Sequence, residues 1–150
     1  MSKAKIIDFE VVTPEKVVLK REIAQVTLMT TSGEITVLAN HLPLVTVLKP
    51  GVMEIKLASG ELEIVSISGG FMEVMKDRVV ILADTAERAS DLDEERIKAA
   101  KLKAENRKKE AQSLDEVQFA NIAAQLEKEL ARLKALNRWR HLRGSDRKNL

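Results

Sequence analysis

The placement of glycine and proline divides this 150-residue chain into two parts with different architectures. All three prolines lie at or before Pro50, and no glycine occurs between Gly70 and Gly144. Both residues interrupt regular structure, so the first part favours short elements joined by turns and the second favours long helices. We therefore expect two domains, residues 1–86 and residues 87–150.

Short apolar runs rich in β-branched residues fill the first part, and turn residues such as Asn40, Gly51 and Gly60 separate them. The stretches 54–57 and 61–64 alternate acidic or basic residues with apolar ones, which puts one face in a core and one in water. Runs of this length with short connections predict an antiparallel β-sandwich or barrel of about eight to ten strands.

The second part predicts two antiparallel helices over residues 91–111 and 114–139. Ser90 with Asp93, and Ser113 with Glu116, match the pattern of a hydroxyl cap followed by an acid three residues later. The first helix has a narrow alanine-rich stripe. The second has a stronger apolar seam, made of Phe119, Ala123, Leu126, Leu130 and Leu133, with Leu136 beside it. We expect such a hairpin to be marginally stable alone, and hence mobile.

Composition excludes several classes of site. The chain has no cysteine, and His41 and His141 have no neighbours at metal-ligand spacing, so disulfides, thiolate chemistry and metal binding are not expected. Aromatic residues make up only 3%, which disfavours stacking on nucleic-acid bases. No signal peptide and no membrane-spanning run is present, so we expect a soluble intracellular protein without direct membrane insertion.

Basic residues gather at the end of the chain, although the formal net charge is only +2. From residue 132 onward a single acid, Asp146, stands against Arg132, Lys134, Arg138, Arg140, Arg143, Arg147 and Lys148. This segment suits an acidic protein surface, a membrane surface or nucleic acid, of which nucleic acid is the weakest reading. A plain solvated helix face is the competing interpretation.

Catalytic motifs are absent from the sequence. There is no Gly-x-Ser-x-Gly elbow near a histidine and no glycine-rich phosphate loop, and the Gly69-Gly70 pair reads as a connecting turn. The acids at 93–95 suit a solvated first turn stabilised by the helix dipole. A small hydrolase using His41 stays an open alternative.

Several motifs in order nevertheless resemble one family, the epsilon subunit of the F-type (proton-translocating) ATP synthase. They are Ser32-Gly33-Glu34, His41-Leu42-Pro43-Leu44, Leu48-Lys49-Pro50-Gly51, Ser68-Gly69-Gly70-Phe71 and the run from Val79 to Glu87. The likeness extends over essentially the whole chain.

The resemblance implies an α+β fold in which a β-sandwich of about ten strands precedes an αα-hairpin. It implies a non-catalytic rotor subunit of the central stalk that couples proton translocation to ATP synthesis. Its partners would be the gamma subunit, the c-subunit ring and the catalytic beta subunit, at the cytoplasmic face of a bacterial cell membrane. The hairpin would inhibit ATP hydrolysis when extended, with His41, Arg132, Lys134, Arg138 and Arg140 as partner-binding residues.

The resemblance also implies a regulatory ATP site, with no cofactor required. Leu92-Asp93-Glu94-Glu95-Arg96 matches an ATP-binding motif of bacterial members, and Ile97 stands where the family has alanine. Glu87, Asp93, Arg96 and Arg138 would bind the nucleotide. Arginines pair well with phosphate oxygens and carboxylates accept hydrogen bonds, although Asp93 and Arg96 could instead pair with each other.

Two further departures concern the turn before His41, where Ala39-Asn40 replaces the usual Pro-Gly, and Thr36, which stands where glycine is common. Asparagine tolerates a left-handed backbone, so the turn is expected to survive. The alternative to a rotor subunit is a free-standing adaptor whose basic hairpin binds some other acidic protein.

Overall fold

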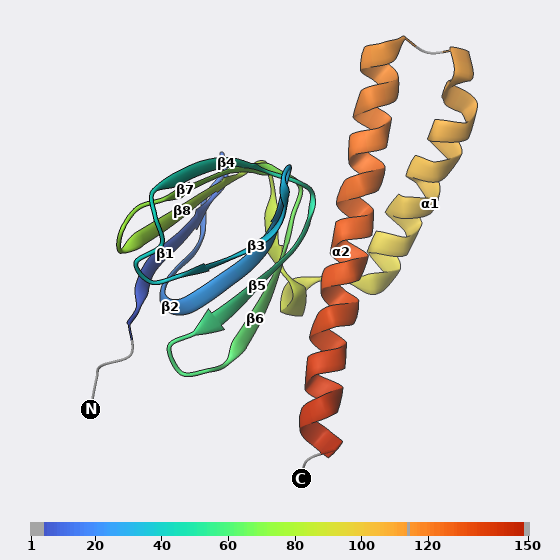
Figure 1. Ribbon diagram of the computed structural model, residues 1–150. Coiled ribbons are helices and arrows are strands. Elements are labelled where there is room, and N and C mark those ends of the chain that lie inside the picture. Colours follow the sequence, from blue (N-terminus) through green and yellow to red (C-terminus); the bar gives the residue numbers. More distant parts are fainter. Residues whose placement is uncertain (1–4, 114, 149–150) are drawn as a thin grey trace.

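A computed structural model describes residues 5–113 and 115–148, and it shows a β-sandwich followed by a helical hairpin (Figure 1). In chain order the elements are β1 Ile7–Val12, β2 Val17–Thr30, β3 Gly33–Leu38, β4 Leu44–Leu48, β5 Gly51–Leu57, β6 Leu62–Ile67, β7 Gly70–Val74, β8 Arg78–Ala83, β9 Ala86–Arg88, a 3-10 turn at Ala89–Asp91, α1 Glu94–Glu110, a second 3-10 turn at Ala111–Ser113, and α2 Glu116–Lys148. The predicted sandwich and helical hairpin are thus confirmed.

The long strand β2 joins the two layers of the sandwich. Its first half pairs with β1, and its second half pairs with β3 and β5. The strand order is β1-β8-β7-β4-β2-β5-β6-β9, and every described pairing is antiparallel except that of β1 with β8. The two layers enclose a core of aliphatic side chains and methionines around one phenylalanine, Phe9.

Gly70 permits two strands to approach closely at the start of β7. Its φ of +134° lies in the region that favours glycine, and an added Cβ would stand 2.1 Å from the carbonyl oxygen of Leu82 on β8. The predicted connecting turn is therefore also the point where β7 begins, pairing with β4 and β8.

Both helices begin later than predicted. Asp93 caps α1, because its Oδ1 accepts hydrogen bonds from the backbone N–H groups of Glu95 and Arg96 at 3.0 and 3.3 Å. Asp115 caps α2 by accepting from Gln118 N–H at 2.8 Å. The predicted serine caps at positions 90 and 113 are wrong, because both serines lie in the 3-10 turns. Leu114, the predicted helix start, lies outside the described residues.

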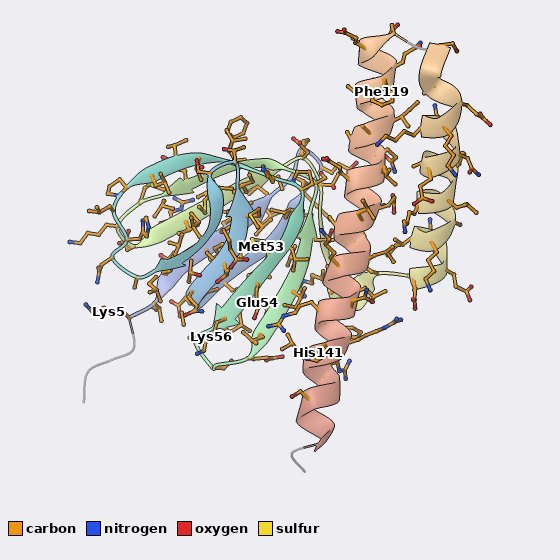
Figure 2. All side chains as sticks on the ribbon, turned by 45° about the vertical axis from the view of Figure 1, so that its right-hand side comes forward. Lys5, Met53, Glu54, Lys56, Phe119 and His141 are labelled. Atoms are coloured by element: carbon orange, nitrogen blue, oxygen red, sulfur yellow. The ribbon has the colours of Figure 1, made fainter. Side chains whose placement is uncertain are left out.

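Helix α2 packs between the sandwich and α1 (Figure 1). One of its faces therefore buries small residues against β5 and β6: Ala135 contacts Ile64 and Ala89, with Trp139 and Leu142 at the margin. The predicted single seam is wrong in part, since Phe119 and Leu130 stay 42% and 37% exposed. Phe119 lies near the far end of the hairpin, away from the sandwich (Figure 2). Helix α2 also continues past the expected end at Trp139, to Lys148.

Candidate functional site

A cavity of about 320 Å³ lies where β9, α1 and α2 meet, and it collects three of the four residues predicted to bind ATP. Glu87 comes from β9, where pairing with Ser66 of β6 fixes its position. Asp93 and Arg96 come from the cap and first turn of α1. The side chains of Arg132 and Glu129 on α2 close the opposite wall. Ile97, the residue in the alanine position of the motif, also lines this cavity and is buried.

In the described part of the chain, the side chains of Asp93 and Arg96 form no ion pair with each other. The carboxylate of Asp93 caps the helix and accepts the backbone N–H of Arg96. The Arg96 side chain is exposed at the cavity wall. A guanidinium held at a cavity mouth near a helix N-terminus is well placed to bind an anion.

Arg132 bridges two carboxylates inside this cavity. Its Nε donates to Glu87 Oε2 at 2.8 Å, its Nη2 donates to Glu87 Oε1, and its Nη1 donates to Glu129 Oε1 at 2.7 Å. Burial by itself would lower the pKa of Arg132, but the hydrogen bonds and charges of Glu87 and Glu129 outweigh burial and raise it. The fork of Arg132 on Glu87 fastens α2 to the last strand of the sandwich.

Glu129 is fully buried on α2. Its Oε1 accepts from Arg132 and from Gln125 Nε2 at 2.9 Å, whereas its Oε2 has no hydrogen-bond partner among the described residues. A buried carboxylate oxygen without a donor is costly, and natural proteins rarely keep one without a reason.

Arg138, the fourth predicted ATP residue, lies elsewhere. Its Nε and Nη2 donate to Glu54 of β5, both at 3.1 Å, and these hydrogen bonds raise the pKa of Arg138. Glu54 lies on the side of the sandwich next to α2 (Figure 2). Arg132 is the second-helix arginine that faces Glu87, and the sequence marks it only by its position three residues after Glu129.

A second groove continues from the first along the two helices. It has a volume of about 580 Å³ and shares Ala100 with the first cavity. Ala104 and Ile122 form its apolar part, and Lys103 and Arg107 add positive charge. Both neighbouring cavities have cationic side chains on their walls.

The residues predicted to bind a partner are mostly engaged within the chain. Arg132 pairs with Glu87, Arg138 with Glu54, and Arg140 with Glu94, whose Oε2 lies 2.6 Å from Arg140 Nη1. Lys134 is exposed and makes no ion pair with the described residues. The side chains of Arg147 and Lys148 lie outside the described part of the chain.

His41 occupies the turn between β3 and β4, and its Nδ1 lies 2.6 Å from the carbonyl oxygen of Leu42. Asn40 before it has φ of +64°, as expected for a residue that replaces glycine. Leu42 is 79% exposed, so this turn presents an apolar side chain beside an imidazole. Thr36 has its own cross-strand partner, since its Oγ1 lies 2.8 Å from Thr27 Oγ1.

An exposed apolar row crosses three strands on the outer face of the sandwich. Val47 of β4 stands opposite Phe71 of β7, which in turn stands opposite Leu82 of β8. These side chains are 43%, 54% and 53% exposed. Contiguous exposed apolar residues of this kind mark interaction surfaces.

No group of three or more potential metal ligands occurs among the described residues. No described helix combines the length and hydropathy needed to cross a membrane.

Comparison with known proteins gives consistent matches. The family model described as the beta-sandwich domain of the ATP synthase delta/epsilon chain matches residues 6–89. The ATP synthase epsilon chain of Desulforamulus reducens is 48% identical over 126 residues, covering 84% of this chain and 93% of that protein. The same subunit of Delftia acidovorans is 39% identical over 137 residues, covering 91% and 98%.

A solved structure is similar as well. A chain in the cryo-EM structure of the Euglena gracilis mitochondrial ATP synthase, in an assembly that contains the c-ring, superposes with a TM-score of 0.70 at 28% identity. The match covers 85% of this chain and 79% of that chain.

Proposed function

The chain belongs to the ATP synthase epsilon family, and from this premise we propose that it is the central-stalk rotor subunit whose hairpin regulates ATP hydrolysis. In this role the subunit is non-catalytic, and it couples proton translocation to ATP synthesis at the cytoplasmic face of a bacterial membrane. The observation that carries the proposal is that three basic residues of α2 are held by the chain's own glutamates. The matches give the adaptor alternative no support.

The sandwich supplies the surfaces for assembly. The apolar row of Val47, Phe71 and Leu82 suits a permanent contact with the gamma subunit, because apolar side chains exposed on a sheet face are best covered by a partner. The turn with His41 and Leu42 suits the polar loops of the c-ring. Phe71→Ser should therefore weaken co-purification of the chain with the gamma subunit while leaving the melting temperature of the isolated chain unchanged.

The hairpin supplies the regulation. In the folded form Arg132, Arg138 and Arg140 face Glu87, Glu54 and Glu94. When α2 extends, an acidic loop of the catalytic beta subunit replaces these carboxylates as the partner of the same arginines. The conformational equilibrium is then a competition between internal and external acids, so a modest difference in free energy is enough to shift it.

ATP favours the folded form in this proposal. The cavity offers Arg96 and Arg132 for phosphate oxygens, and Glu87 can accept a hydrogen bond from the nucleotide once Arg132 turns toward the phosphates. The neighbouring groove, with Lys103 and Arg107, gives the length that a nucleoside triphosphate needs. Because the cavity is walled by β9, α1 and α2 together, ATP binds only when the hairpin is folded.

The test compares ATP hydrolysis by the ATP synthase complex carrying the full chain with hydrolysis by a complex carrying a chain that ends at Ala89. The truncated form should hydrolyse ATP faster when ATP is scarce. Equal rates would remove the inhibitory role. Lys134→Gln refines the test, because it removes a charge offered to the beta subunit without touching any described internal ion pair. It should relieve inhibition in part, whereas Lys109→Gln on α1, an exposed lysine that lines neither cavity, should not.

A further inference from the structure

Glu129 carries the single orphan polar atom found among the described buried side chains, its Oε2. The side chain is held rigidly, since Oε1 accepts from both Arg132 and Gln125. The ion pair with Arg132 accounts for Oε1, but no described contact accounts for Oε2. An apolar side chain of similar volume would avoid the cost of burying a charge.

The location of Glu129 connects this orphan oxygen with ligand binding. Glu129 lines the same cavity as Glu87, Arg96 and Arg132. The guanidinium of Arg132 lies against the same carboxylate, and 19% of the Arg132 side chain is still exposed. An anion entering the cavity can draw Arg132 toward itself, and this movement uncovers Glu129 for a hydrogen-bond donor.

We propose that Glu129 is a ligand-binding residue of this cavity, whose carboxylate accepts a hydrogen bond from an amino or hydroxyl group of the ligand. The inference rests on the proposed ATP site and adds a requirement to it. The ligand must carry an anionic group for Arg96 and Arg132 and, separately, a donor for Glu129. A nucleoside polyphosphate has both, whereas inorganic triphosphate has no amino group and no sugar hydroxyl.

The proposal explains how a ligand would hold α2 in place. Glu129 belongs to α2, Arg96 belongs to α1 and Glu87 belongs to β9. A ligand that reaches Glu129 therefore spans all three elements and is lost when α2 leaves. A buried acceptor that is left without a donor lowers the affinity for a wrong ligand more than a solvent-exposed acceptor does. Glu129 therefore also makes the cavity selective for ligands that carry a hydrogen-bond donor.

Isothermal titration calorimetry on the full chain tests the assignment, with ATP and inorganic triphosphate as the probes. Glu129→Gln should weaken ATP binding at least about tenfold, since a charged acceptor is lost, and should not weaken triphosphate binding. The matched control is Glu127→Gln, an exposed acid two residues away on the same helix, which should leave both affinities within about twofold. Equal weakening of ATP and triphosphate by Glu129→Gln would mean that Glu129 acts only through Arg132, and would overturn the proposal.

Ligand analogues on the wild-type chain keep the test valid if Glu129→Gln alters the folding of the hairpin. An ATP analogue without the 6-amino group and one without both ribose hydroxyls remove the two kinds of donor in turn. One of the two analogues should bind the wild-type chain about tenfold more weakly than ATP does. The same analogue and ATP should bind Glu129→Gln with equal affinity. Analogues that bind the wild-type chain as well as ATP does would overturn the proposal. If the wild-type chain binds ATP and Glu129→Gln binds it equally, only Glu129 is wrongly assigned; if the wild-type chain does not bind ATP, the ATP site fails too.

Discussion

Replacing Arg132 should open the hairpin more than replacing any other arginine of α2. Arg132→Gln removes the fork on Glu87 and leaves the buried Glu129 with Gln125 alone. Hydrogen bonds between charged groups contribute about 1.5–3 kcal/mol each, and breaking a buried pair costs more. The side chains of Arg132 and Glu87 are 19% and 35% exposed, which reduces the effect.

We therefore expect a loss of about 2–3 kcal/mol in the free energy of hairpin docking, or a roughly 30- to 160-fold larger open fraction, at 1.36 kcal/mol per factor of ten. Hydrogen exchange followed by mass spectrometry measures this open fraction. Amides of α2 should exchange faster by that factor while those of β1 and β8, which do not pack against α2, keep their rates.

The control for this prediction is Arg140→Gln. Its side chain is 50% exposed and pairs with Glu94 at the surface, where solvent screens the charges, so the expected loss is much smaller than that for Arg132→Gln. Glu87→Gln should reproduce most of the effect of Arg132→Gln, and the double variant should be far from additive. The reasoning would be refuted by equal exchange of α2 in the Arg132 and Arg140 variants.

Two further predictions concern the sandwich and the pH dependence. Gly70→Ala should destabilise the sandwich by at least about 2 kcal/mol, because the new Cβ would clash with the backbone of β8. The control Gly60→Ala, at φ +90° with open space around it, should cost about 1 kcal/mol. Thermal unfolding distinguishes the two variants, and equal melting temperatures would contradict the prediction. The hydrogen bonds from Lys98 and then Arg140 lower the pKa of Glu94 from its ordinary 4.5, so its contribution to docking is present at neutral pH and is lost as pH falls below about 4.5 through the lowered value. In an NMR titration of the Glu94 carboxyl, Arg140→Gln should move this pKa part of the way back, and an unchanged pKa would show that the two do not interact in solution.

The division into sandwich and hairpin could be predicted because it depends on local chemistry. Turn residues interrupt the first part at short intervals, and the absence of glycine and proline from residue 71 to 143 permits long helices. Asn40 adopts the left-handed backbone that its side chain tolerates. Such features can be predicted without knowing the tertiary contacts.

The capping residues were harder to predict, because several polar residues compete at each helix start. Ser90 and Asp93 both have the chemistry of a cap, and the choice depends on the 3-10 turn that Ala89 forms against the sandwich. Asp93 takes the cap because the helix begins only after this turn. Local patterns do not reveal a packing constraint of that kind.

The arginine that faces Glu87 could not be identified from the sequence for a similar reason. Arg132 and Arg138 are six residues apart, which places them about 120° apart around a helix of 3.6 residues per turn. Which of them faces the cavity depends on how α2 is rotated between α1 and the sandwich. Ala135, the small residue on which α2 rests against Ile64, sets that rotation. A seam read from large apolar residues alone overlooks alanines that permit close approach.

In the proposed mechanism, ligand binding and hairpin docking are a single equilibrium. Hydrogen exchange of the isolated full chain with and without saturating ATP tests it. We expect ATP to slow exchange across α2 and the first turn of α1, by a factor that grows with ATP concentration, while amides of β1 and β8 keep their rates. ATP binding that is measurable by calorimetry but leaves the exchange of α2 unchanged would contradict the account.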